Sequence, residues 1–96
     1  AGAVTSFGDE NANLAEGMNF GSANLSADRT LTLPASPSVG DIVRVKAPVS
    51  LGGNALIIQV DGGGSHTIDG VSSIRLESDF AAIACMFVAA NTWRIF

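Results

Sequence analysis

The stretch TLTLPASPSVGDIVRVK, residues 30–46, restricts the possible folds more than any other part of the chain. Apolar and polar residues alternate through TLTL and again through VRVK, which is the two-residue period of a half-buried β-strand. Pro34 and Pro37 lie between the two runs, and proline cannot donate a hydrogen bond to a neighbouring strand. Gly40 supplies backbone freedom just before Asp41 opens the second run. The stretch therefore predicts two strands joined by a turn that contains Pro34, Gly40 and Asp41.

Similar runs recur along the rest of the chain. Residues 55–60 are apolar on both faces until Gln59, which predicts a strand that is covered on both sides. The glycine-rich DGGG at residues 61–64 and the pair Asp69-Gly70 predict turns, the second of them a hairpin. Further strands are expected at residues 29–33, 41–46, 73–77, 80–89 and 93–96. In the run over residues 80–89, one face is expected to carry Ile83, Cys85 and Phe87.

No apolar stripe with the period of a helix persists anywhere in the sequence. Ninety-six residues make one domain at most. Several short strands separated by glycine, proline and asparagine predict an all-β domain, an antiparallel β-sandwich or a jelly-roll-like barrel. Residues 1–16 mix small and acidic residues without lysine or arginine and are expected to form an extended N-terminal arm and loop, with one short strand at residues 3–7. Residues 17–96 are expected to form the β-sandwich domain.

The composition indicates an interface. Hydrophobic residues make up 47% of the chain and charged residues only 15%, against roughly 25% charged residues in typical soluble domains. A small monomer would have to expose part of that apolar surface, so we expect some of it to lie in a subunit or partner contact. The net charge of −4 argues against nucleic acid as a partner and against membrane binding through a basic face. A single cysteine excludes an internal disulfide and a cysteine-rich zinc site.

His66 is the only histidine, and it lies in the glycine-rich segment GGSHTIDG. Ser65 and the nearby acids Asp61 and Asp69 would supply the residue types of a hydrolytic site. However, a nucleophile, a base and an orienting acid must meet on a rigid scaffold, and all three types here belong to one loop. We therefore expect no enzymatic activity, and we expect His66 to lie at a turn or a subunit contact.

Asp61, Asp69, Glu77 and Asp79 could together suggest a calcium site, which needs six to eight oxygen ligands. Their spacing matches no EF-hand, and two of them lie beside glycines, where turns commonly use aspartate. Solvated turn acids are the expected interpretation, so no metal and no cofactor is predicted. Cys85 lies in an apolar run without a basic neighbour and is expected to be buried.

Arg44 and Lys46 alternate with valines and form the only close basic pair. Such a pair is usually a solvated sheet face, but it could also meet an acidic partner. Val4, Phe7, Met18 and Phe20 precede the best strands; they either complete the core or help the arm to extend a neighbouring sheet. Met18 and Phe20 are expected on one face at the start of the core sheet. The candidate interface residues are thus Val4, Phe7, Met18, Phe20, Arg44, Lys46 and His66.

Beyond these patterns, the segments TLTLPASPSVGDIVRVK, GGNALIIQVDGGGSHTIDG and SSIRLESDFAAIACMFVAANTWRIF together resemble a module of tailed-bacteriophage structural proteins. That module occurs in head-decoration proteins, tail fibres and tail spikes. The resemblance covers about residues 25–96. The family has no catalytic residues to assign to this chain. The resemblance implies structural roles only, for Leu33-Pro34, Gly40-Asp41 and Ile68-Asp69-Gly70 at turns and for Trp93, which would close the core.

The resemblance implies a small β-domain in a virion, often trimeric. We therefore expect a non-enzymatic capsid decoration (cement) protein, a homo-oligomer and most simply a trimer, which binds the major capsid protein or another virion protein. The alternative is a receptor-binding or adhesive tip of a tail fibre. That role would favour exposed aromatic side chains around a sugar site, and the chain has no tyrosine and one tryptophan.

Overall fold

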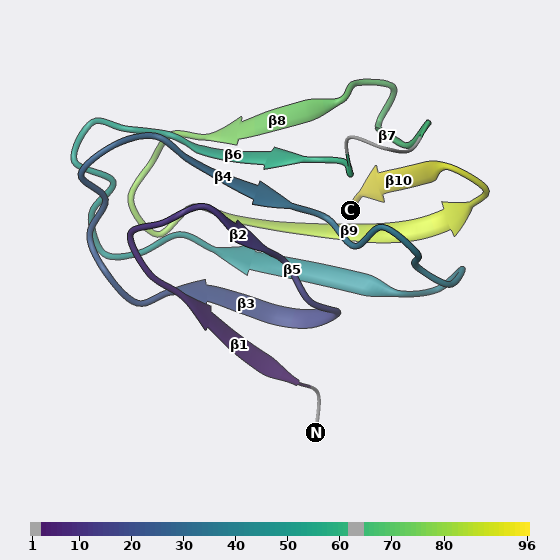
Figure 1. Ribbon diagram of the computed structural model, residues 1–96, viewed down its shortest axis with the longest axis horizontal. Helices are drawn as coiled ribbons and strands as arrows, with labels where there is room; N and C mark the ends of the chain where they lie inside the picture. The colour runs from purple at the N-terminus through teal and green to yellow at the C-terminus, as the bar shows by residue number, and fades with distance from the viewer. Residues whose placement is uncertain (1–2, 62–64) are drawn as a thin grey trace.

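The computed structural model of the chain describes residues 3–61 and 65–96 (Figure 1). These residues form ten β-strands and contain no helix. The strands are β1 Val4–Phe7, β2 Ala12–Asn13, β3 Gly17–Gly21, β4 Arg29–Thr32, β5 Ile42–Lys46, β6 Leu56–Gln59, β7 Thr67–Ile68, β8 Ser73–Leu76, β9 Ala82–Ala89 and β10 Thr92–Ile95. The all-β prediction is confirmed. No helix long and apolar enough to cross a membrane occurs within these described ranges.

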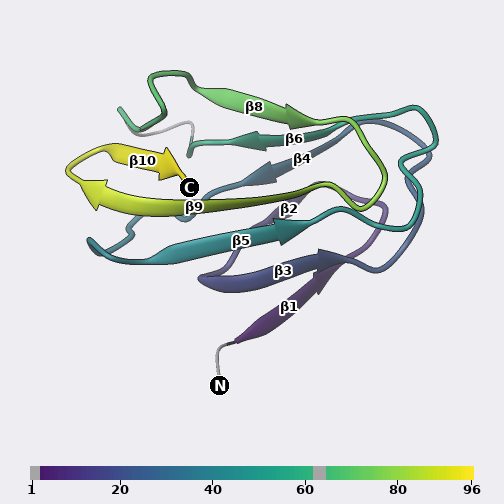
Figure 2. The same ribbon diagram turned by 180° about the vertical axis from the view of Figure 1, so that it is seen from behind.

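The chain alternates between two sheets. Sheet A has the strand order β1-β3-β5-β9-β10-β7, and sheet B has the order β2-β4-β6-β8. Consecutive strands from β1 to β6 lie in opposite sheets, and each pairs in parallel with the strand two places away along the chain. Each circuit through both sheets returns the chain to its starting direction, which makes these pairs parallel (Figures 1 and 2).

The prediction of antiparallel pairing is therefore wrong for the first part of both sheets. Antiparallel pairs occur only toward the C-terminal side, where β9 pairs with β5 and β10, and β8 pairs with β6. The two-residue period of a strand does not distinguish the two directions, because side chains alternate in the same way in both. Both sheets are mixed.

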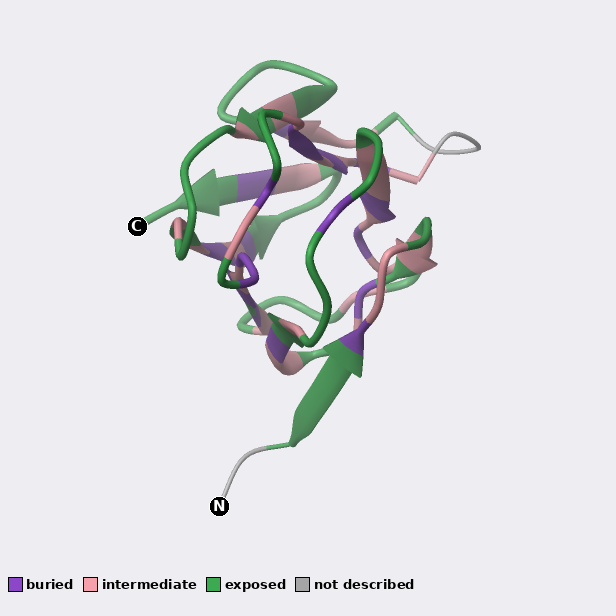
Figure 3. Ribbon diagram, turned by 90° about the vertical axis from the view of Figure 1, so that its left-hand side faces the viewer, coloured by how far each residue is buried: buried purple, intermediate pink, exposed green. Residues whose placement is uncertain are grey.

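One hydrophobic core is shared by the two sheets, so the described residues form a single domain. Trp93 is completely buried, and its ring packs edge-on against Phe87 with 5.2 Å between ring centroids. Phe7 and Leu14, from the segment expected to be an arm and loop, also belong to this core. In Figure 3, β1 is exposed along most of its length and buried only at its end. Residues 4–7 and 12–13 thus pair within the sheets.

Most predicted strands and turns are confirmed. Gly40, Asp69 and Gly70 have positive φ angles of 98°, 47° and 87°, and Ile68 and Val71 form the bridge that closes the hairpin. The Asp41 carboxylate accepts a hydrogen bond from the Ser38 backbone N–H at 2.9 Å, and Pro34 lies two residues after the end of β4 at Thr32. The prediction that residues 55–60 are covered on both sides is wrong: in β6, Leu56 and Ile58 face the core and are buried, but Ile57 and Gln59 lie on the other face and are only half-buried. The predicted turn at residues 62–64 lies outside the described residues.

The orientation of β3 differs from a simple apolar-in pattern. Met18 and Phe20 share a face, as predicted, but that face points out of the molecule, and Asn19 points into it with 1% exposure. The Asn19 side chain accepts a hydrogen bond from the Ala15 backbone N–H and donates to the Ala15 and Arg44 carbonyls. These bonds compensate for burying a polar amide. They also fix the turn that leads into β3.

Candidate interaction face

Strand register places residues from four neighbouring strands of sheet A side by side on its outer surface. One row runs Val4, Met18, Arg44, Ala84, and the next runs Ser6, Phe20, Lys46, Ala82. Phe96 joins the first row, since its backbone N–H donates to the Ala84 carbonyl at 3.0 Å. We call this surface, with the adjoining Phe80, the outer face.

Large apolar side chains are exposed on the outer face. Val4 is 67% exposed, Phe96 60% and Phe80 53%, and Phe20 is also exposed. Single exposed apolar residues are common on soluble proteins, but a group of them on one surface is typical of an interaction site. These four come from the two ends of the chain, from β3 and from the connection before β9. Only the fold brings them together.

Arg44 and Lys46 lie in the middle of this apolar group, and each contacts an aromatic ring. The Arg44 guanidinium carbon is 5.4 Å from the centre of the Phe96 ring, and the Lys46 ammonium nitrogen is 5.8 Å from that of Phe80. Lys46 also donates a hydrogen bond to the Phe80 carbonyl at 2.6 Å. Such cation–π contacts are worth about 0.5–1 kcal/mol at exposed sites. They hold the basic side chains over the apolar surface.

The charges of Arg44 and Lys46 have no acidic partner among the described residues. The other three of the five basic residues each have an acidic partner within 4.0 Å. Arg29 pairs with Asp9, Arg75 with Asp28 and Glu77, and Arg94 with Asp69. The two unpaired positive charges of an acidic chain therefore lie together on the outer face. A partner carrying carboxylates would complement them.

Two open depressions flank Arg44 on this surface. One, of about 260 Å³, is lined by Met18, Ala84 and Phe96 among others; the second, of about 340 Å³, extends to Val4 and Glu16 at the sheet edge. Their walls are mainly aliphatic and aromatic. They could accept small apolar side chains of a partner beside a carboxylate held by Arg44.

The outer surface of sheet B has a different chemistry. One of its rows runs Asn13, Thr32, Gln59, Ser73, and the Gln59 amide donates to the Thr32 hydroxyl at 3.2 Å. The next row runs Thr30, Ile57, Arg75, and the Arg75 charge is paired with Asp28 and Glu77. A shallow depression of about 430 Å³ there is lined by asparagine, threonine, glutamine and alanine side chains. Uncharged polar groups of this kind are well solvated by water. The contrast identifies the outer face of sheet A as the better interaction surface.

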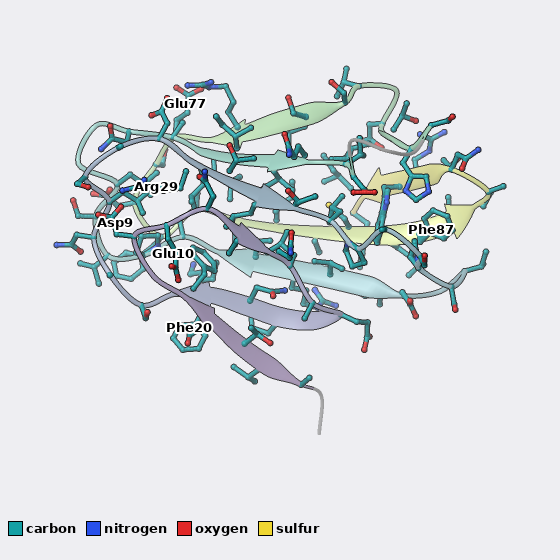
Figure 4. All side chains as sticks on the ribbon, in the orientation of Figure 1. Asp9, Glu10, Phe20, Arg29, Glu77 and Phe87 are labelled. Atoms are coloured by element: carbon teal, nitrogen blue, oxygen red, sulfur yellow. The ribbon has the colours of Figure 1, made fainter. Side chains whose placement is uncertain are left out.

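An ion pair fixes the end of the molecule where β1 passes into β2 (Figure 4). The Asp9 carboxylate accepts hydrogen bonds from the Arg29 guanidinium at 2.8 Å and from the Ser26 hydroxyl at 2.6 Å. These hydrogen bonds, that from Arg29 foremost, lower the pKa of Asp9 from 3.8 to about 2, and the same contact raises the pKa of Arg29. The pair ties the first loop to the start of β4.

Five of the seven predicted interface residues belong to the outer face: Val4, Met18, Phe20, Arg44 and Lys46. Phe7 does not, because it points into the core and is 5% exposed. His66 lies elsewhere, half-buried, with its ring centroid 5.4 Å from that of Phe87. The sequence did not indicate that Phe80 and Phe96 belong to this surface, since neither lies in the same alternating run as any of these five residues.

The acids suspected of binding calcium are dispersed. Asp79 accepts a hydrogen bond from the Leu51 backbone N–H, Asp69 accepts one from Ile95 N–H, and Glu77 pairs with Arg75. Within residues 3–61 and 65–96, no three His, Cys, Asp or Glu side chains lie close enough together to hold a metal ion. His66 Nδ1 is buried without a hydrogen-bond partner among the same residues, so it forms no bond to Ser65 or to an acid.

Cys85 is buried in the core, as predicted. Desolvation by this burial raises the pKa of its thiol to about 11. A thiol with a raised pKa is a poor nucleophile, because the thiolate is the reactive form. Cys85 therefore acts as a small apolar core residue.

Comparison of the sequence with models of known protein families finds no match. Comparison with curated proteins finds no similar sequence either.

Proposed function

We propose that this chain is a non-enzymatic structural protein that binds a large protein assembly through the outer face of sheet A. The observation that carries this proposal is the grouping, by strand register, of exposed aromatic and aliphatic side chains around two unpaired basic residues. Aromatic residues, methionine and arginine are enriched at protein interfaces, whereas lysine and acids are depleted. The binding surface on the partner would carry carboxylates within an apolar patch.

The specific role that we propose is decoration of a tailed-phage head. It rests on the resemblance of residues 25–96 to virion modules and on the binding chemistry of the outer face. In this proposal the two mixed sheets pack as a sandwich that keeps the outer face rigid. A rigid face loses little conformational freedom on docking, which favours binding. The virion would then be the site of action, with the major capsid protein as the partner.

Gold-labelled antibody staining of intact virions of the encoding phage, read by electron microscopy, tests this role. Label distributed over the heads is the expected result. Label confined to fibre ends would support the adhesive-tip alternative and contradict decoration. Virions without label would overturn both virion roles, while leaving the binding chemistry of the outer face to be tested separately.

A further inference from the structure

The first strand leaves one edge of sheet A open. β1 pairs with β3 on one side, and on its other side it has no partner within the part of the chain that the structure describes. Figures 1 and 2 show this flank of β1 free along its length. Its sequence, VTSF, contains no charge and no proline, and three of its four residues are exposed. An uncharged open edge is a template for pairing with another strand.

The other sheet edges are protected. β2 and β7 are only two residues long. β8, the remaining edge, carries Arg75, whose guanidinium lies 3.7 Å from both the Asp28 and the Glu77 carboxylates. Short strands and charged side chains are the common ways in which proteins prevent edge pairing. Among the described edges, β1 lacks every one of these devices.

The backbone groups of β1 specify how a second strand would pair with it. The Ala3 and Phe7 carbonyls accept hydrogen bonds from the backbone N–H groups of Met18 and Ser22, on the β3 side. Because successive residues of a strand direct their backbone groups to opposite sides, the N–H and C=O groups of Val4 and Ser6 point away from β3. These four groups form the unpaired row of an open edge and are free to bond a further strand.

We propose that two copies of this chain pair through β1, antiparallel, around a two-fold axis at Thr5. In that register Val4 faces Ser6 of the second copy, and the two residues exchange both backbone hydrogen bonds. The same occurs at the symmetry-related pair, so all four free groups are satisfied. A strand that satisfies itself in this way is self-complementary, and a two-fold contact closes with two copies. The expectation of a trimer is replaced by a dimer.

The pairing would also cover exposed side chains. Thr5 points to the core side, like Phe7, but is exposed because it lies at the edge of the sheet. In the dimer the two Thr5 side chains would lie directly opposite each other, where threonine pairs stabilise antiparallel strands. The axis is perpendicular to the sheet, so both outer faces point the same way. The inference does not depend on the proposed function, because it rests on the edge of sheet A alone.

Disulfide trapping tests the register. Thr5→Cys places two thiols at a non-hydrogen-bonded pair, where the Cα atoms are about 4.5 Å apart and within reach of a disulfide. The matched control is Ser6→Cys on the same strand, whose symmetry mate lies diagonally across at about 7–8 Å and faces the outer surface. Cys85 remains in both variants, since it is buried. We expect the Thr5→Cys chain to form a covalent dimer about tenfold faster than the control, or more.

Size-exclusion chromatography with light scattering gives an independent measurement of the number of chains per particle. We expect a dimer for the wild type and a monomer for Val4→Lys, because a charge at the edge opposes pairing. Val39→Lys is the matched control, since Val39 is 68% exposed, like Val4, but lies in the connection before β5. A monomeric wild type, a trimer, or equal cross-linking at positions 5 and 6 would each overturn the proposal. Circular dichroism shows that each variant is folded before it is compared.

Discussion

At the scale of single residues, Asn19 has the most demanding environment in the molecule. It is the only buried polar residue among those the structure describes, and its amide bonds three backbone groups of Ala15 and Arg44. The sequence did not predict this, because asparagine is usually exposed or in a turn. Alternation placed Met18 and Phe20 on one face, but it left open whether that face belongs to the core or to an interface. The strand was predictable, but which of its faces is buried was not.

Asn19→Ala should lower the free energy of unfolding by about 2–4 kcal/mol, because it leaves buried backbone groups without partners. Asn13→Ala is the control, since Asn13 is an exposed asparagine in a strand of sheet B. Urea unfolding followed by tryptophan fluorescence measures both, because Trp93 is the only tryptophan and is fully buried. Equal losses in the two variants would contradict the assigned role of Asn19.

The Asp9–Arg29 pair predicts an acid dependence of stability. The folded-state pKa of Asp9 is about 2, below the 3.8 of an unperturbed carboxyl. The contribution of Asp9 to the free energy of unfolding is therefore complete above about pH 4 and is lost as the pH falls through 2. Asp9→Ala should melt at a lower temperature than the wild type near neutral pH, and this difference should shrink toward zero as the pH approaches 2. A difference that stays constant with pH would show that the ion pair is not its source.

At the scale of elements, the positions of the longer strands could be predicted, but their partners could not. The runs at residues 41–46 and 80–89 correspond to β5 and β9, with Val43, Val45, Cys85 and Phe87 buried as alternation indicates. The two-residue strands β2 and β7 are too short to show a period. Parallel pairing follows from the alternation of the chain between two sheets. That path is set by connection geometry and is not visible in any one strand.

The docking of β1 on β3 depends on Gly17. This residue has φ of 98°, and a Cβ at this position would lie 2.6 Å from the Ala3 carbonyl oxygen. That carbonyl is the one that bonds Met18 N–H at the start of the β1–β3 pair. Any larger residue would therefore push β1 away from the sheet as well as strain the backbone.

Gly17→Ala should consequently cost more stability than Gly40→Ala. Gly40 has the same φ of 98° but no atom within 4 Å of its added Cβ, so it isolates the cost of the backbone angle. We expect an excess loss of about 1–3 kcal/mol for Gly17→Ala from the steric conflict. Hydrogen exchange should also show faster exchange at Thr5 in that variant. The same loss in both variants would mean that β1 is not held by this close approach.

For the whole molecule, the outer face shows how much of an interaction site can be predicted from the sequence. Arg44 and Lys46 were visible as a basic pair on an alternating strand, and Met18 and Phe20 as an apolar pair. Phe80 and Phe96 could not be assigned to the same surface, because they lie 34 and 50 residues beyond Lys46 in the chain. The pairing of β9 with β5 and with β10 brings them beside the basic residues. The residue types of the outer face could be predicted from single strands, whereas their grouping on one surface depends on how the strands pair.

Co-sedimentation of the purified chain with phage heads that lack it tests whether the outer face is the docking surface. Arg44→Glu reverses the charge at the centre of the outer face, and Arg75→Glu makes the same change on β8 of sheet B, where Arg75 is exposed. We expect a loss of affinity of about tenfold or more for Arg44→Glu, because the new carboxylate would repel an acidic partner. Arg75→Glu should bind like the wild type. Unchanged binding by folded Arg44→Glu, or an equal loss in both variants, would contradict docking through the outer face.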